Sequence, residues 1–287
     1  MIRRVLMGNI GVVINDFTSS GHSEFEKVNR KKESFRKREA MLLKVGATGR
    51  IHTIDKHRDD TEKVTYSVHY TYFIKHGDHY YLEEEVENRR AVHYGGVIYE
   101  DVEEPIQAME PGVDEEESGE GERLEYRYDR HAAVQYAEKW WNSYNPAFKK
   151  FENDCTNFIS QCLHAGDAPM RGYPTKGKGW WMRNQSWSYS WTVAHSLRQY
   201  IPNSSVGLRG KLVDSPDKLK LGDVICYDFE GDGRFDHTTI VTGRDADGMP
   251  LVNAHTYNCR MRYWNYEDST AYTPNIKYKF LTIMDDR

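Results

Sequence analysis

A cysteine stands at the predicted start of a helix in the segment 153–163, whose sequence is NDCTNFISQCL. Asn153 and Asp154 precede Cys155, and both are residue types whose side-chain oxygens cap free main-chain N–H groups. Apolar residues then recur at helical spacing. Because a helix N-terminus favours an anion, this position predicts a thiol with a lowered pKa and therefore a nucleophilic thiolate. The alternative is that Cys155 is a small buried apolar residue, as most free cysteines are.

A cysteine nucleophile needs a base within hydrogen-bond reach and a polar group that orients this base. His237 opens a predicted strand directly after the turn-rich segment 231–236, so its ring can project from the rim of a sheet. The next predicted strand carries Asn253 and His255, which share a face because they are two positions apart. The sequence does not fix the register, so either of them could orient His237.

The segment before His237 resembles the first half of a calcium loop through Asp228, Glu230 and Asp232. An EF-hand requires an acid at the twelfth position, which is Thr239 here. A polar turn that presents His237 is therefore the favoured interpretation, and a weak cation site is the alternative. The four cysteines contain no C-x-x-C pair, which argues against structural zinc. We expect no metal and no other cofactor.

The pattern of apolar residues divides the chain before the cysteine segment. Charged and apolar residues at helical spacing predict an amphipathic helix over 24–44. Strict alternation over 64–72 predicts a half-buried strand, and a turn at 76–79 predicts a hairpin. A further strand is predicted over 92–99. Residues 1–100 are thus expected to form a small helix-plus-sheet domain of unknown role.

Residues 101–125 are rich in Glu, Asp, Pro and Gly, which predicts a flexible acidic linker. In residues 126–287, predicted helices come first and antiparallel strands follow, which is typical of an α+β domain. An irregular loop within this domain carries Trp180 and Trp181, which could line a substrate cleft or belong to the core.

Composition narrows the function classes further. The formal net charge is −5, with acidic residues concentrated in one segment, so nucleic acid is not an expected partner. No apolar run reaches the ~18 residues of a transmembrane helix. The first residues do not resemble a secretory signal, which favours a cytoplasmic protein.

Four short motifs occur in a fixed order: D-C-T-N-F-I-S-Q at 154–161, S-W at 190–191, G-D-V at 222–224 and D-H-T at 236–238. Together they resemble the bacterial putative amidase domain family, one of the papain-like cysteine hydrolases alongside the NlpC-type and CHAP cell-wall peptidases. The resemblance covers about residues 126–287. It implies that Cys155 is the nucleophile, His237 the general base and Asn253 the orienting residue.

Papain-like enzymes carry an oxyanion-hole Gln six positions before the nucleophile, where this chain has Lys149. The main-chain N–H of Cys155, helped by a polar side chain such as Asn153, is the expected replacement. Asn153 and Asp154 are accordingly expected to contact substrate, as are Trp180 and Trp181.

The sequence therefore predicts a small α+β domain followed by a papain-like cysteine amidase or peptidase domain. Its expected substrate is a peptide or a cell-wall fragment, and the family analogy would place it at the cell wall. The alternative is a catalytically inactive binding or scaffold protein that uses the N-terminal sheet and the cleft. The sequence specifies neither the scissile bond nor the oligomeric state.

Overall fold

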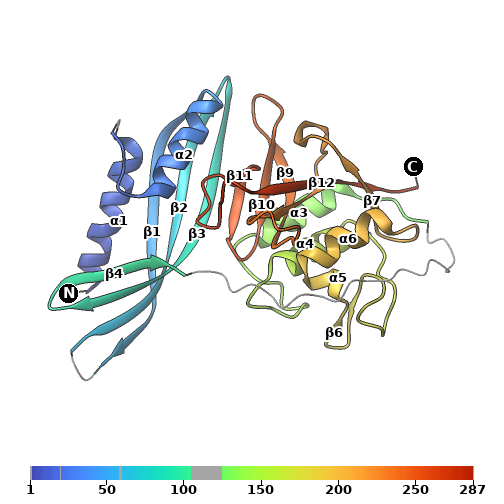
Figure 1. Cartoon of the computed structure of the whole chain (residues 1–287), viewed down its shortest axis with the longest axis horizontal. Coiled ribbons are helices and arrows are strands. Elements are labelled where there is room, and N and C mark those ends of the chain that lie inside the picture. The colour runs from blue at the N-terminus through green and yellow to red at the C-terminus, as the bar shows by residue number, and fades with distance from the viewer. Residues whose placement is uncertain (1, 20, 58–59, 105–124, 287) are drawn as a thin grey trace. The chain divides into compact units, whose positions relative to one another are not determined.

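The computed structural model describes residues 2–19, 21–57, 60–104 and 125–286 (Figure 1). The chain divides into two compact units, and both combine helices with antiparallel strands, which confirms the predicted α+β class. The first unit comprises residues 1–105 and 265–272, and the second comprises residues 106–264 and 273–287. The short segment 265–272 thus belongs to the first unit although it lies late in the chain.

The first unit contains two helices and four strands. In chain order these are α1 (Ile2–Thr18), α2 (Glu26–Lys37), β1 (Ala40–Lys56), β2 (Glu62–His76), β3 (His79–Tyr94) and β4 (Val97–Glu103).

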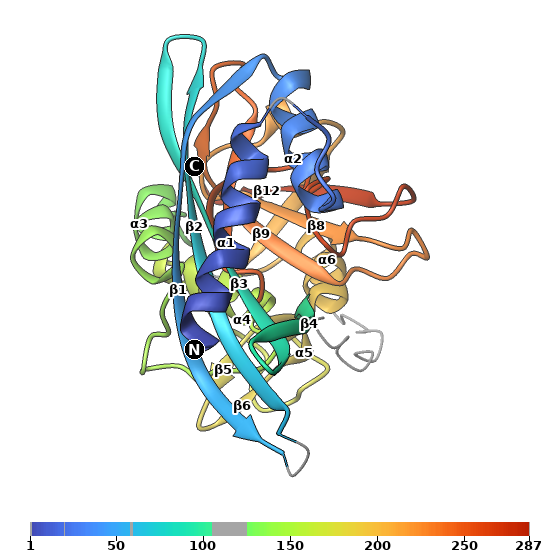
Figure 2. The ribbon, with the colours of Figure 1, turned by 90° about the vertical axis from the view of Figure 1, so that its left-hand side faces the viewer.

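Strands β1 to β4 pair antiparallel in chain order. Alternation along β2 buries one row of side chains, including Val64, Val68 and Tyr72, as predicted. The predicted hairpin is confirmed, since His76 pairs with His79 across the turn. Helix α1 crosses in front of these strands in Figure 2, and its buried residues join the same core.

Two sequence predictions for the first unit were wrong, and one helix was missed. The helix predicted over 24–44 ends at Lys37, because residues from Ala40 onward pair with β2 instead. Helix α1 was not predicted. The segment 92–99 is not one strand, since Gly95 and Gly96 have positive φ and form the turn between β3 and β4.

The predicted linker lies mainly in residues 105–124, outside the described residues, while its first three residues belong to β4.

The second unit begins with helices and ends with strands. Its helices are α3 (Arg130–Trp140), α4 (Cys155–Ala165), α5 (Tyr189–Thr192), α6 (Ala194–Asn203) and the 3₁₀ turn η1 (Pro216–Lys218). Its strands are β5 (Met182–Arg183), β6 (Ser186–Trp187), β7 (Arg209–Val213), β8 (Val224–Asp228), β9 (His237–Arg244), β10 (Pro250–Ala254), β11 (Cys259–Tyr263) and β12 (Lys277–Met284).

In the second unit the strand order is β11-β10-β9-β8-β12-β7, with antiparallel neighbours. Helices α3 and α4 contact β9 and β10, and α6 contacts β12 and β7. Phe158 and Ile159 of α4 pack in one core with Cys226 and Ile240 of the sheet. This packing sets the start of α4 against the start of β9.

Within the described part of the chain, no helix combines the length and apolar character needed to cross a membrane.

Candidate active site

Helix α4 begins at Cys155, but its N-terminus is capped by a residue far away in the sequence. The hydroxyl Oγ1 of Thr256 accepts hydrogen bonds from the main-chain N–H groups of Asp154 (2.8 Å) and Cys155 (2.9 Å). The prediction that Asp154 caps this helix with its side chain was wrong, because its carboxylate makes no capping bond.

Two contacts tie the start of α4 to the start of β9. The Cys155 Sγ atom lies 3.9 Å from the carbonyl oxygen of Asp236, and the hydroxyls of Thr156 and Thr238 lie 3.2 Å apart. Because His237 stands between Asp236 and Thr238, its main chain passes directly beside the thiol. The structure thus brings together the two segments that the sequence had selected for nucleophile and base.

The Cys155 thiol is buried, with a residue exposure of 5%. This burial raises the pKa of Cys155, and hydrogen bonding from Thr156 and from the main chain of Thr238 acts in the opposite direction without offsetting it. The prediction of a lowered thiol pKa was therefore wrong. The favourable helix terminus is present, but the cost of placing a thiolate away from water is larger.

The His237 ring lies among aromatic side chains. Its centroid is 5.7 Å from that of Tyr227, 6.2 Å from that of Phe229 and 5.9 Å from that of Tyr257. Burial and, to a smaller degree, the positive charge of Arg262 lower the pKa of His237 to about 3. The imidazole is therefore neutral at pH 7 and able to accept a proton.

Side chains alternate across the sheet along β9. Thr238 reaches Thr156 of α4, whereas His237 packs against Tyr227, its partner across the strand pair. The thiol therefore contacts the carbonyl oxygen of Asp236, while the His237 ring packs against Tyr227 and Phe229.

Asn253 and His255, the two candidates for the orienting role, make their described hydrogen bonds elsewhere. The Asn253 amide donates to Glu138 (2.8 Å) and accepts from the Thr242 hydroxyl (2.8 Å) and from the N–H of Met261 (2.9 Å). It thereby joins β10 to α3 and β11. These contacts account for Asn253 as a structural residue of the sheet.

His255 forms a buried ion pair beside the cysteine. Its Nδ1 lies 2.8 Å from the Asp154 carboxylate and its Nε2 lies 2.8 Å from the carbonyl oxygen of Trp140. The groups that face the two ring nitrogens, a carboxylate and a carbonyl oxygen, are both hydrogen-bond acceptors. The ring also stacks on Phe158 of α4 at 3.9 Å.

Asp154 is almost fully buried, and its carboxylate is occupied by groups of the protein. Besides His255, it accepts from the N–H of Phe151 and from the Asn157 amide, both at 2.9 Å. The expectation that Asp154 contacts substrate is therefore wrong: this carboxylate holds the loop before α4 in place. Asn153, directly before it, is partly exposed.

Trp180 and Trp181 do not line an open cleft, in contrast to the expectation. Both are buried, with the indole N–H of Trp180 donating to Ser160 (2.9 Å) and that of Trp181 to the Lys178 carbonyl (3.0 Å). Lys149, at the papain oxyanion position, has its ammonium group 4.4 Å from the ring centroid of Trp187.

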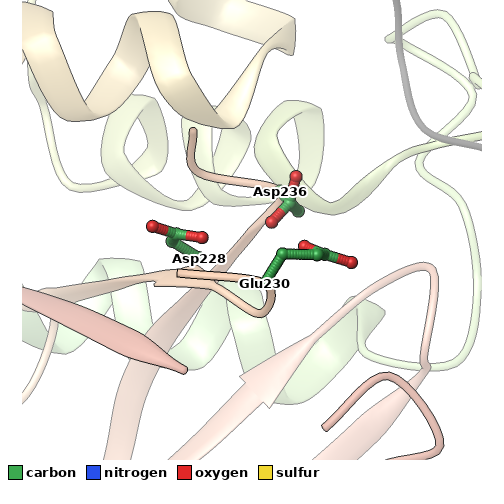
Figure 3. A group of neighbouring side chains, drawn as sticks. All are labelled: Asp228, Glu230 and Asp236. Atoms are coloured by element: carbon green, nitrogen blue, oxygen red, sulfur yellow. The ribbon is translucent and has the colours of Figure 1, made fainter. Parts of the chain in front are cut away.

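The turn between β8 and β9 gathers three acidic residues, shown in Figure 3. Oxygen atoms of Asp228, Glu230 and Asp236 lie within 4.8 Å of one another. The carboxylate of Asp228 accepts main-chain N–H groups of residues 231–233, which folds the turn. Asp236 is exposed as a residue, but partial desolvation of its carboxyl group, with the neighbouring charge and hydrogen bond of Glu230, raises its pKa to about 7, while the hydrogen bond from the N–H of Phe229 acts in the opposite direction. A proton that Asp236 retains would thus reduce the repulsion between these three closely spaced carboxyl groups.

Comparison with known proteins shows the family to which the chain belongs. The family model described as "Putative amidase domain" matches residues 127–281. The chain belongs to this amidase family. It is 49% identical to the Bacillus subtilis (strain 168) protein YhbB over 291 aligned positions, which cover 96% of this chain and 93% of the relative. It is also 36% identical to YjcM of the same strain over 140 positions, which cover 46% of this chain and 31% of that relative. No solved structure matches.

The residue that the sequence did not reveal is Thr256. It lies 101 positions after Cys155, and no local pattern marks a threonine between two strands as the cap of a distant helix. Its φ of +75° is rare for a β-branched residue, so this conformation could not be predicted from the residue type either.

Proposed function

We propose that this member of the amidase family is a cysteine-dependent amidase or peptidase of the papain-like class. The observation that carries the proposal is the position of Cys155 as the first residue of α4, with its sulfur 3.9 Å from the carbonyl oxygen of the residue before His237. A nucleophile at a helix N-terminus and a base at the start of the neighbouring strand are what such chemistry requires.

In the proposed reaction the resting thiol and imidazole are both neutral. The Cys155 sulfur attacks the amide carbonyl carbon while its proton passes to His237, and the carbonyl π electrons move to the oxygen. The C–N bond then breaks as the amine takes the proton from His237, which leaves a thioester that water hydrolyses. The proposed step requires the His237 imidazole to come within hydrogen-bond reach of the Cys155 sulfur in the substrate complex, because the geometry of a free enzyme alone does not exclude a general base.

The family's relation to cell-wall hydrolases suggests bacterial wall peptides as substrate, and this step rests on analogy. The test is to incubate the full chain with purified bacterial peptidoglycan and with soluble wall peptides, and to measure new amino groups and product masses. Cys155→Ser should abolish product formation, and His237→Gln should lower the rate by about 10²–10⁴-fold. Equal product formation by the Cys155→Ser variant would contradict the proposal.

A second test uses thiol reactivity. Because burial raises the pKa of Cys155, its alkylation by iodoacetamide should be slow at pH 7. The rate should rise only at pH values above ~8.5, the pKa of an ordinary thiol. Mass spectrometry assigns each label to its cysteine, and the fully buried Cys162 of the same helix is the internal control. Alkylation at Cys155 that is already fast at pH 6 would show that the thiol is a stabilised thiolate.

A catalytically inactive binding protein is the competing function, and one feature of the first unit favours it. A cavity of about 150 Å³ lies between α1 and the sheet. It is lined by Asn9, Ile10, Val12, Val13, Phe25, Tyr66, Tyr70, Arg89 and Asp101. Its charged groups pair with each other, since Arg89 and the Tyr66 hydroxyl both donate to Asp101. Product formation that depends on Cys155 would decide against this alternative.

A further inference from the structure

The hydroxyl of Thr256 occupies the place where a papain-like enzyme would bind the oxyanion. It accepts the N–H of Cys155 at 2.9 Å and the N–H of Asp154 at 2.8 Å. The main-chain N–H of Cys155, which the sequence had suggested as an oxyanion donor, is thus already engaged. Thr256 itself is only partly buried.

The hydroxyl proton of Thr256 is available for a hydrogen bond to a ligand. A threonine hydroxyl carries two acceptor sites and one proton. Both acceptor sites are used by N–H groups, and among the residues that the structure describes no acceptor takes the proton. Accepting two hydrogen bonds polarises an O–H group and strengthens the bond that it donates.

The backbone of Thr256 is held in an unfavourable conformation. Its φ of +75° lies in the left-handed region, where a β-branched side chain is strained. Such strain persists only where the surrounding structure imposes it, and it is concentrated at functional sites. At this position it keeps the hydroxyl on the helix terminus, directly beside the residue that carries the thiol.

We propose that Thr256 is the oxyanion-stabilising residue of this amidase, with its hydroxyl donating to the substrate oxygen when the Cys155 sulfur attacks. The S–C bond forms, the carbonyl π electrons become the oxyanion, and the Thr256 O–H donates to it without giving up its proton. The inference rests on the proposed function, because it needs Cys155 as nucleophile.

The experiment compares two reactions of the same thiol in the full chain. Acylation of Cys155 by p-nitrophenyl acetate passes through a tetrahedral oxyanion, whereas alkylation by iodoacetamide displaces iodide at a saturated carbon and forms none. Their rate constants are measured by p-nitrophenolate release and by intact mass. The variants are Thr256→Gly, which removes the hydroxyl and accepts positive φ without strain, and Thr256→Ser, which keeps the hydroxyl.

Loss of one oxyanion donor should slow acylation of the Thr256→Gly variant by about 10²–10³-fold while alkylation is unchanged. Thr256→Ser should retain acylation near the wild-type rate. Thermal unfolding followed by circular dichroism confirms that the variants are folded, and Thr256→Val is the second hydroxyl-free variant.

Acylation of Thr256→Gly at the wild-type rate would overturn the inference alone, since the freed N–H of Cys155 would then suffice. A parallel fall of acylation and alkylation would also overturn it, because it would show that Thr256 merely positions the thiol. If p-nitrophenyl acetate does not acylate Cys155 in the wild type, the proposed function fails and this inference with it.

Discussion

The two units bury ionisable side chains in opposite ways. In the first unit, Lys31 is 2% exposed and its ammonium group contacts Glu83 at 2.5 Å and Asp268 at 2.7 Å, so charge is balanced by charge. In the second unit, burial keeps Cys155 and His237 neutral. The comparison distinguishes structural from reactive groups. Fully paired charges such as Lys31 stabilise the fold, whereas neutral groups such as Cys155 and His237 can exchange a proton in a reaction.

The second unit also contains a paired scaffold next to its reactive thiol. Asp154, directly before Cys155, pairs with His255. Both ring nitrogens of His255 and the carboxylate of Asp154 already have partners within the protein, so neither side chain is available for catalysis. A buried pair of side chains and a buried neutral thiol thus lie next to each other at the start of α4. The following predictions test whether the distinction between paired and neutral groups holds.

The largest expected effect is on the stability of the first unit. Lys31→Met leaves the buried carboxylates of Glu83 and Asp268 without their cation, so the free energy of unfolding should fall by about 3–5 kcal/mol. Urea denaturation followed by circular dichroism measures it.

The matched control is Lys37→Met, which breaks an exposed pair to Glu267 in the same segment 265–272. Exposed pairs contribute about 0–1 kcal/mol, so this variant should be nearly as stable as the wild type. Equal losses in the two variants would show that Lys31 is solvated and that the first unit does not depend on paired charge.

A smaller loss of stability is expected at the start of α4. Asp154→Asn weakens a charged hydrogen bond to the buried His255, which should cost about 1.5–3 kcal/mol of unfolding free energy. All 7 Trp residues belong to the second unit, so tryptophan fluorescence in urea reports on this unit alone.

Asp129→Asn is the control for Asp154→Asn. Asp129 caps α3 through its bond from the N–H of Ala132, and Asn caps helices about as well as Asp. An Asp154→Asn variant as stable as this control would mean that the Asp154 carboxylate contributes no more than an amide to the contact with His255, and that the paired scaffold beside the thiol is absent.

The same distinction explains what the sequence could predict. Helix α4 and strand β2 were predicted because their patterns are local, since side chains two or four positions apart share a face. Helix α1 was missed because Gly8 and Gly11 weaken its propensity, and only packing of residues such as Leu6 against the first-unit core stabilises it.

The features of the site that depend on neighbouring residues in the sequence were predicted. The residue types at Cys155 and His237 were visible in the motifs, whereas the burial that sets their pKa values arises from tertiary packing, such as that of the His237 ring against Tyr227, Phe229 and Tyr257. The cap from Thr256 and the pairing of Asp154 with His255 connect residues 101 positions apart. No periodicity within either segment encodes such contacts.

The smallest expected effect concerns a carboxyl group that follows neither rule, because Asp236 is exposed and solvent screens its interactions. Partial desolvation of its carboxyl group and the proximity of Glu230 raise the pKa of Asp236 from 3.8 to about 7 in the folded protein, although the residue is as exposed as Asp232. As the pH rises through this range, the unfolded chain releases the proton first, so the free energy of unfolding should decline between pH 4 and pH 7. Asp236→Asn removes this decline, and its advantage over the wild type should grow from pH 5 to pH 8 in urea denaturation.

Asp232→Asn is the control within the same turn, because Asp232 is exposed and lies outside the carboxyl cluster. It should shift stability equally at both pH values. Parallel pH profiles for the wild type and Asp236→Asn would show that Asp236 ionises normally. A difference of the expected sign would mean that the residue whose carbonyl contacts the Cys155 sulfur changes charge near neutral pH, so a group that titrates lies near the thiol in addition to the buried pair of Asp154 and His255.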